Sequence, residues 1–393
     1  MKNAIIVSLD ANWRTVMEGT LLARGWQVAS VETLSPGDQP APESVHAVVV
    51  DSASIESSAV AAWLGAMGAD LKVPLIMAPG LKQVEALAEA IDVPTAPIKA
   101  SGNVILRFWG VRGSIPTPGP NTVFYGGNTS CVELDADGQI IILDAGSGIR
   151  GLGNSLMARA AATKTKLDIH LLITHTHWDH IQGLPFFVPA YIPTNHLRVV
   201  GYKAVCHHLA EVLAKQMDSA YFPVAMEDMP SHPDVEEVDD HFDCGPVKVV
   251  AFFTNHPGRC AGFRLETSAG SVVYMSDNEL NHHGQATHLP RETSEHLYQR
   301  LVDTIKGTRI LIHDAQYTLA EYDSKIGWGH SAIEDVIEMA AAAEVEHLYL
   351  FHHDPTRSGA DINRIVQQCR ATAREKGWTM LIDAAREGME IAL

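Results

Sequence analysis

The sequence predicts an α/β protein of two domains, and two patterns carry this prediction. Over residues 1–102, short apolar runs alternate with amphipathic stretches, which is typical of a parallel sheet flanked by helices. Beyond a linker at 98–103 the pattern changes, and strand-like runs there end repeatedly in histidine or aspartate. We therefore expect an N-terminal domain at 1–102 and a second domain at 103–393 that carries the chemistry.

The overall composition excludes several classes of protein. Acidic residues outnumber basic ones by 47 to 29, and the formal charge of -18 argues against a long cationic track for a polynucleotide. Five cysteines without a CxxC pair argue against a disulfide framework and against a cysteine zinc site. The first apolar run is too short for a signal peptide, and no run reaches the roughly 18 apolar residues of a membrane span. We expect a cytoplasmic enzyme with no membrane partner and no extended nucleic-acid partner.

In the first domain, charged residues follow the predicted strands at the sheet edge where ligands bind in parallel α/β folds. Asp10 follows the first strand, Asp51 the third and Lys99 the fifth. This spacing resembles a response-regulator receiver domain, a flavodoxin-like parallel sheet. The resemblance makes Asp51 a candidate phosphoacceptor and the domain a candidate contact for a signalling partner. One acid of the usual pair and the hydroxyl residue after the fourth strand are missing, which favours a structural or docking role.

The second domain is organised around the hexapeptide His-Thr-His-Trp-Asp-His that begins at His175. The residues before it form a short β-branched, apolar run, so the hexapeptide is expected where a buried strand ends. Imidazole and carboxylate are ligands for zinc, iron and manganese. Four such groups this close cannot all reach one tetrahedral ion, so His175 and His177 are expected to share one ion while Asp179 and His180 turn toward a second. A polar loop whose histidines only form hydrogen bonds is the alternative.

Further segments, taken together with this hexapeptide, resemble one superfamily. They are RFWGVRGSIPTPGPNT from Arg107, YGGNTSC from Tyr125, ILDAGSG from Ile142, WGHS from Trp328 and LFHHDP from Leu350. The combination resembles the metallo-β-lactamase superfamily, and within it the branch of tRNA 3′-end nucleases and phosphodiesterases of cyclic phosphates and cyclic nucleotides. The resemblance covers about residues 104–393 and implies an αββα sandwich with two divalent metal ions at the sheet edges. Zinc is the expected metal, with manganese and iron as alternatives.

The resemblance also implies the ligand set. It assigns His175, His177 and His256 to one ion, Asp179, His180 and His352 to the other, and Asp277 to a bridge between the two. His352 and His353 are neighbours, and only one of them is expected to ligate because adjacent side chains point in different directions. We choose His352, the first position beyond a predicted strand, and expect His353 to face the substrate or to support a ligand through a hydrogen bond.

Other residues around this centre are candidates for catalysis and substrate binding. The resemblance gives His330 the task of acting on the scissile phosphate, with a loop or capping histidine as the alternative. It gives Asp179 the task of orienting the nucleophile. Arg112 is a candidate phosphate clamp, with pairing to an acid inside its own loop or at a subunit interface as the alternative, and Asn128 is a further candidate for substrate contact. Asp144 is expected to accept a hydrogen bond from a ligand imidazole, with a turn-capping aspartate as the alternative.

Two local expectations concern the surroundings of this centre. Residues 191–240 are rich in aromatic, methionine and acidic side chains, and they are predicted to be an insertion bordering the site, as a lid or a dimer contact. The run over 332–343 predicts a helix, and Ser331 directly before it is the expected N-cap.

These expectations describe a dinuclear metal-dependent phosphodiesterase. A metal-bridging hydroxide would attack phosphorus, and the substrate would be a small, cyclic nucleotide or a cyclic phosphate. Family habit favours a homodimer. Two alternatives stay open. The same ligand set serves lactone and thioester hydrolysis, and a di-iron redox or gas sensor could use the receiver-like domain as its output.

Overall fold

The computed structural model describes residues 2–7, 26–31, 47–51, 75–78, 104–280 and 291–393. The chain divides into two compact units, Met1–Ala96 and Pro97–Leu393. The linker expected at 98–103 lies outside the described residues. Within the described ranges, no helix is long and apolar enough to cross a membrane.

The N-terminal unit contains a parallel sheet, as the alternating apolar runs predict. Its strands are β1 (Lys2–Val7), β2 (Trp26–Val31), β3 (Ala47–Asp51) and β4 (Leu75–Ala78). They lie in the order β2-β1-β3-β4, and every neighbouring pair is parallel. Asp51 is the last residue of β3, whereas Asp10, Lys99 and the predicted fifth strand lie outside the described residues. The receiver-like character of this unit therefore stays a prediction.

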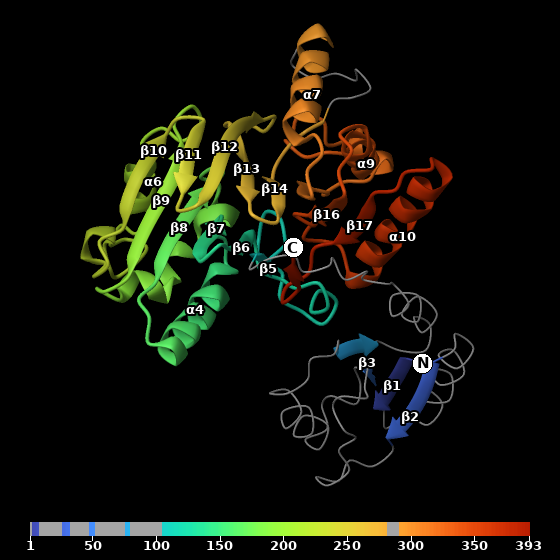
Figure 1. Cartoon of the computed structure of the whole chain (residues 1–393), viewed down its shortest axis with the longest axis horizontal. Helices are drawn as coiled ribbons and strands as arrows, with labels where there is room; N and C mark the ends of the chain where they lie inside the picture. Colours follow the sequence, from blue (N-terminus) through green and yellow to red (C-terminus); the bar gives the residue numbers. More distant parts are fainter. Residues whose placement is uncertain (1, 8–25, 32–46, 52–74, 79–103, 281–290) are drawn as a thin grey trace. The chain divides into compact units, whose positions relative to one another are not determined.

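The described part of the second unit is built on two seven-stranded sheets (Figure 1). The first sheet has the order β10-β9-β8-β7-β6-β5-β18. Its strands are β5 (Val104–Gly110), β6 (Cys131–Ala136), β7 (Gln139–Leu143), β8 (Asp168–Ile173), β9 (His196–Tyr202), β10 (Asp234–Val238) and β18 (Glu390–Ala392). The strands from β7 to β10 are parallel, and β6, β5 and β18 continue the sheet in antiparallel pairs.

The second sheet runs through the strands from β11 to β17 in chain order. Its strands are β11 (His241–Cys244), β12 (Val247–Thr254), β13 (Cys260–Thr267), β14 (Gly270–Met275), β15 (Ile310–Asp314), β16 (His347–Phe351) and β17 (Leu381–Ala384). The pairs from β11 to β14 are antiparallel, and those from β14 to β17 are parallel. The strands β12, β14, β15 and β16 therefore point the same way and end at one edge.

One hydrophobic core lies between the two sheets, and a second lies between the second sheet and the helices that cover its outer face. Along β5, buried residues alternate with half-buried ones, the pattern of a strand with one face against a core. Phe108 of β5 contacts two rings of the opposite sheet, with centroids 5.5 Å from Tyr349 and 6.1 Å from Phe351. Tyr274 of β14 contacts Phe351 from within its own sheet at 5.6 Å. These aromatic contacts hold the sheets face to face as a sandwich.

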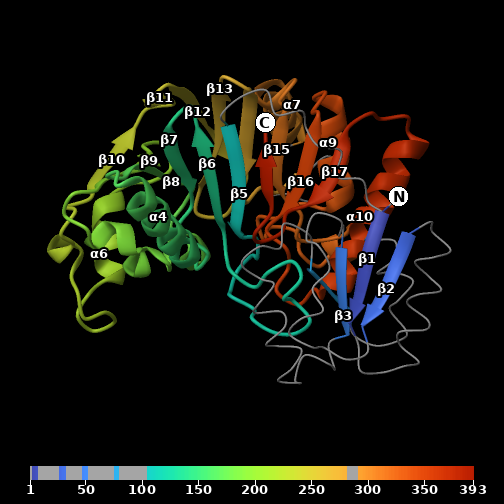
Figure 2. The same ribbon diagram turned by 60° about the horizontal axis from the view of Figure 1, so that its bottom comes forward.

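Helices cover the outer faces of the sandwich (Figure 2), and these are α4 (Ile149–Thr163), α6 (Leu209–Gln216), α7 (Arg291–Ile305), α9 (Ile333–Ala342) and α10 (Gly359–Glu375). Two short helices, α5 (Trp178–Ile181) and α8 (Leu319–Tyr322), follow β8 and β15 in the chain. Helix α4 contacts β5 and α6 contacts β10, while α9 contacts β15 and α10 contacts β17. In α10 the buried positions Ile362, Val366, Cys369 and Ala373 form one helical stripe, which explains how this helix packs on its sheet.

Two local expectations need correction. Residues 191–240 are not an appended insertion, because they supply β9 and β10 of the first sheet as well as α6. Ser331 does not cap α9, whose N-cap position is Ala332. The Ser331 hydroxyl instead donates to the Asn278 carbonyl at 2.5 Å and accepts the N–H of Leu280 at 3.0 Å. This serine therefore ties the segment before α9 to the segment after β14.

Candidate metal centre

Strand ends bring the predicted ligands together. His175 follows β8 of the first sheet, while His256, Asp277 and His352 follow β12, β14 and β16 of the second sheet. These three strands of the second sheet share a direction, so the residues after them emerge at one edge. The turn from β8 into the short helix α5 brings the rest of the hexapeptide to the same place. The centre thus lies where both sheets end.

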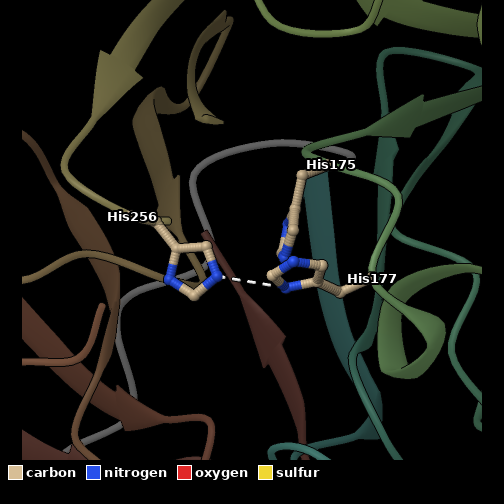
Figure 3. A group of neighbouring side chains, drawn as sticks. All are labelled: His175, His177 and His256. Carbon is tan, nitrogen blue, oxygen red and sulfur yellow. Dashed lines mark hydrogen bonds between the residues drawn. The ribbon is translucent and has the colours of Figure 1, made fainter. Parts of the chain in front are cut away.

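His175, His177 and His256 form what we call the first group. Figure 3 shows their imidazoles turned toward one another, and one nitrogen of each lies within 4.8 Å of the others. Nε2 of His256 is 3.1 Å from Nδ1 of His177. The opposite nitrogen of His256 donates to the Gly329 carbonyl at 2.9 Å, and Nδ1 of His175 pairs with the Thr174 hydroxyl at 3.0 Å. These bonds fix which nitrogen faces the centre, as metal-binding imidazoles require.

Asp179, His180 and His352 form the second group. Oδ2 of Asp179 lies 3.1 Å from Nε2 of His352 and 3.4 Å from Nε2 of His180. The Nδ1 atoms of both rings have acceptors behind them. For His352 this is the Gln316 side-chain oxygen at 3.0 Å, and for His180 it is the Asp144 carboxylate at 2.8 Å. The second group is therefore oriented in the same way as the first.

Asp277 lies between the two groups, and each of its two carboxylate oxygens lies near ligand nitrogens of a different group. Oδ1 is 3.2 Å from Nε2 of His180 and 3.5 Å from Nε2 of His352. Oδ2 is 3.8 Å from Nε2 of His175 and 3.7 Å from Nε2 of His256. A carboxylate in this position can bind one ion through each oxygen.

Unpartnered buried atoms show that metal ions fit this donor set. Nε2 of His175, Nε2 of His180 and Oδ1 of Asp277 are buried without a hydrogen-bond partner. Leaving such atoms unsatisfied costs about 1–3 kcal/mol each, and a cation held among them would remove that cost. Burial, with the neighbouring His180, holds the pKa of His175 well below its usual value, which favours the neutral imidazole that metals bind. The mixed imidazole and carboxylate set suits zinc, and also manganese or iron.

His330 lies beside Asp277 and is paired with a carboxylate that the sequence did not single out. Its Nδ1 atom is 2.9 Å from Oδ2 of Asp314 and 4.0 Å from Oδ2 of Asp277. Burial alone would lower the pKa of His330, but the charge and hydrogen bond of Asp314 raise that pKa to about 9. Asp314 ends β15 in the run Ile-Leu-Ile-His-Asp, so an acid at a strand end was the signal that could have found it.

Arg112 is held by backbone carbonyls of its own loop region and of the distant segment after β16, rather than at the metal groups. Its side chain is fully buried. The guanidinium donates to backbone carbonyls at 2.8–3.2 Å, which are those of Gly126, Asp354 and Arg357. This geometry favours the alternative of a structural arginine, and phosphate binding by Arg112 stays a prediction. The same loop reaches the centre through its backbone, since the N–H of Ser114 donates to Oδ2 of Asp179 at 2.7 Å.

The other two candidates for substrate contact also have protein partners. Asn128 donates through Nδ2 to Glu387 at 2.9 Å, and its backbone N–H donates to the same carboxylate at 2.6 Å. His353 is buried and donates through Nε2 to the Ala385 carbonyl at 3.0 Å. Substrate contact by either residue stays a prediction. The structure brings His352, and not His353, into the metal groups.

Two packed sheets with histidines and aspartates gathered at their strand ends define a class of protein, the metal-dependent hydrolases of sandwich fold, and they suggest a dinuclear metal site. A sequence profile of the family described as "Beta-lactamase superfamily domain" matches residues 139–353, over half of the chain. The chain belongs to this superfamily, and it is a metal-dependent hydrolase.

Relatives and solved structures agree with this assignment. A protein named "Ribonuclease Z" from Natronomonas pharaonis is 23% identical over 292 residues, which cover 63% of this chain and 86% of that protein. The fold is similar to that of unliganded yeast PDE1, with a TM-score of 0.54, 14% identity and coverage of 74% of this chain and 99% of that one. It is also similar to a diphosphatase of the PhnP family, with a TM-score of 0.50, 17% identity and coverage of 74% and 98%. At these identities the solved structures establish the fold alone.

Proposed function

We propose that the chain is a dinuclear metal-dependent phosphodiesterase. The observation that carries the proposal is the arrangement around Asp277, whose two oxygens each lie near the nitrogens of a different group of histidines. Two-metal sites of this kind serve displacement at phosphorus, where both the attacking and the leaving oxygen need charge stabilisation. The relative named ribonuclease Z supports a phosphodiester bond as the target.

The residues around the centre have distinct roles in this proposal. Two bound divalent ions would supply the Lewis acidity that activates water and offsets charge on the phosphoryl oxygens. Asp179, which accepts the N–H of Ser114, would orient the attacking water. His330 is held through Nδ1 by Asp314, so Nε2 is the nitrogen that would pass a proton to the leaving oxygen.

For the substrate we propose a small nucleotide, with a cyclic phosphodiester as the favoured form. The support is the formal charge of -18, which disfavours a long phosphate track. The name of the Natronomonas relative is at odds with the expectation that no extended nucleic acid binds, so RNA is the competing substrate. Lactone or thioester hydrolysis and a di-iron sensor remain the alternative functions. The cytoplasmic location remains a prediction.

A substrate panel tests the proposal. The zinc- or manganese-loaded protein is incubated with cyclic mononucleotides, cyclic dinucleotides, 2′,3′-cyclic nucleotides and a short RNA, and the products are resolved by chromatography. We expect turnover of a cyclic member, lost in Asp179→Asn and kept in the control Asp168→Asn, whose side chain is 64% exposed at the start of β8. If only the RNA is cleaved, RNA is the substrate and the proposal of a cyclic phosphodiester is rejected. No turnover of any member with metal bound would reject the phosphodiesterase and favour the lactone and sensor alternatives.

For the N-terminal unit we propose a receiver-like sheet with a docking role. Its strand order β2-β1-β3-β4, all parallel, agrees with the flavodoxin-like order of this fold class. Treatment with acetyl phosphate followed by intact-mass analysis tests Asp51, with Asp51→Asn as the control. We expect no phosphorylation, and a mass gain that Asp51→Asn abolishes would assign a switching role instead. Light scattering tests the homodimer, which stays a prediction.

A further inference from the structure

Glu279 is a buried carboxylate close to the metal groups that the proposed reaction does not yet use. It follows Asp277 by two positions, and only 5% of it is exposed. Oε1 accepts the Tyr322 hydroxyl at 2.8 Å and the Gly327 N–H at 2.7 Å. Oε2 accepts the Gly329 N–H at 2.9 Å. One carboxylate thus holds both ends of the 327–329 turn, and a neutral amide of the same size could not reproduce this, because its NH₂ group would face an N–H donor.

The backbone of Glu279 is tied to the segment that carries His256. Its N–H donates to the Asn255 carbonyl at 2.7 Å, and the Asn255 amide donates back to the Glu279 carbonyl at 2.8 Å. His256 in turn donates through Nδ1 to the Gly329 carbonyl at 2.9 Å. These hydrogen bonds, together with the peptide bond between Asn255 and His256, form a closed circuit from Glu279 through Gly329 to His256 and back through Asn255. The ring of a first-group ligand is positioned by this circuit.

The close approach at Gly329 makes this circuit sensitive to small shifts. Gly329 has φ +87°, and a Cβ added there would lie 2.2 Å from Nδ1 of His256. The Gly329 backbone therefore lies directly against the His256 ring, and movement of the turn would move the acceptor that orients this ring. The next residue is His330, so the same turn also sets the start of the segment that carries the proposed proton donor.

We propose that Glu279 is a positioning residue for the metal centre. Its carboxylate fixes the 327–329 turn. The Gly329 carbonyl then holds Nδ1 of His256, so that Nε2 faces the metal site, and the position of His330, the next residue, is fixed by the same turn. This inference rests on the proposed two-metal site, and it adds that the affinity of the first group depends on a carboxylate that does not itself bind the ion.

Metal binding by Glu279→Gln tests the inference. The apoprotein is titrated with Co²⁺, visible absorption follows the binding of each ion, and a chelator competition gives each affinity. We expect the first-group ion to bind about 10- to 100-fold more weakly, as is typical when a hydrogen-bond partner of a ligand histidine is disturbed, with an altered absorption band. We expect the affinity of the second group, which is held by Gln316 and Asp144, to stay within about threefold.

Glu133→Gln is the matched control. Glu133 is a fully buried carboxylate of β6 that pairs with Arg107 and Arg159, away from the two metal groups. We expect this variant to lower the melting temperature and leave both Co²⁺ affinities unchanged. If Glu279→Gln does the same, Glu279 is a purely structural residue and the inference is overturned.

Tyr322→Phe keeps the test decisive if Glu279→Gln fails to fold. It removes one of the donors to Glu279 and leaves both backbone bonds in place, so we expect a weaker effect of about two- to fivefold on the first-group ion. Unchanged affinity in Tyr322→Phe would then overturn the inference. A wild-type protein that binds two Co²⁺ ions yet cleaves no phosphodiester would reject the proposed function, while the role of Glu279 could still be judged from these affinities.

Discussion

Oδ2 of Asp144 lies 2.8 Å from Nδ1 of His180, while Oδ1 of the same carboxylate accepts the backbone N–H of Thr174 at 2.8 Å. Tyr274 donates its hydroxyl to Oδ2 at 2.9 Å, and all four residues are fully buried. One aspartate thus links a ligand ring of the second group to the strand end from which the hexapeptide starts. This link makes the ring orientation a property of the sheet rather than of a mobile loop.

Asp144→Asn should therefore weaken metal binding at the second group. An amide offers one acceptor oxygen and brings donors against the Thr174 or His180 N–H, so we expect roughly 10- to 100-fold lower affinity there. Competition with a chelating dye measures this. Tyr274→Phe is the control, because it removes a single hydrogen bond and should cost about 1 kcal/mol of stability with little change in affinity. Equal affinity in Asp144→Asn would show that Asp144 is only a turn residue.

His352→Asn should reduce the bound metal from two ions to one. Asparagine tolerates the left-handed backbone at φ 53°, so the change removes the imidazole without added strain. His353→Ala should keep both ions, because that ring is hydrogen-bonded to Ala385, and it should lower only the melting temperature. Elemental analysis of the purified variants gives the stoichiometry. Loss of metal in His353→Ala but not in His352→Asn would reverse the assignment.

Arg112→Lys should lower stability and leave substrate affinity unchanged. Lysine cannot reproduce the forked donors that hold three backbone carbonyls, so we expect a loss of about 3 kcal/mol in the free energy of unfolding. Urea denaturation measures the stability, and KM is measured on the folded enzyme. Arg364→Lys, at an exposed ion pair on α10, should change stability by less than about 0.5 kcal/mol. A large rise in KM with little loss of stability would restore Arg112 as a phosphate clamp.

Metal removal should destabilise the second unit as well as abolish activity. Without ions, the buried atoms of His175, His180 and Asp277 lack partners. A metal that binds only the folded state stabilises it by about 2.7 kcal/mol when its concentration is 100 times the dissociation constant. Melting curves with chelator and with added Zn²⁺ measure this gain. His175→Ala should show a smaller gain, and an equal gain in that variant would place the binding elsewhere.

Much of this group of side chains could be named from the sequence. The hexapeptide after β8 was found from its own residues, whereas the histidine after β12 and the aspartate after β14 were named by the resemblance, and the structure shows that all of them follow strand ends. The alternating pattern of the first hundred residues likewise predicted a parallel sheet, whose strand order the structure gives.

Other features depended on contacts between distant segments. Asp314 and Glu279 carry no local signal of the partners that their carboxylates bind, which are His330 at 16 residues from Asp314 and groups at 43 or more residues from Glu279. Residues 191–240 looked like an insertion because they are rich in aromatic, methionine and acidic side chains, yet β9 pairs with β8 and β10 pairs with β9, so both strands belong to the sheet. Ser331 bonds across to the segment after β14 instead of capping its own helix.

By itself the sequence determined the kind of side chains gathered at this centre, since the imidazoles and carboxylates and the strands that precede them are recognisable as local patterns. Only the tertiary structure decided the orientation of each ring, and it groups the side chain of His352, the residue chosen from the sequence, with those of Asp179 and His180. The physical reason is that orientation depends on the hydrogen-bond acceptor behind each imidazole, and acceptors such as Asp144, Gln316 and Gly329 arrive from other parts of the chain.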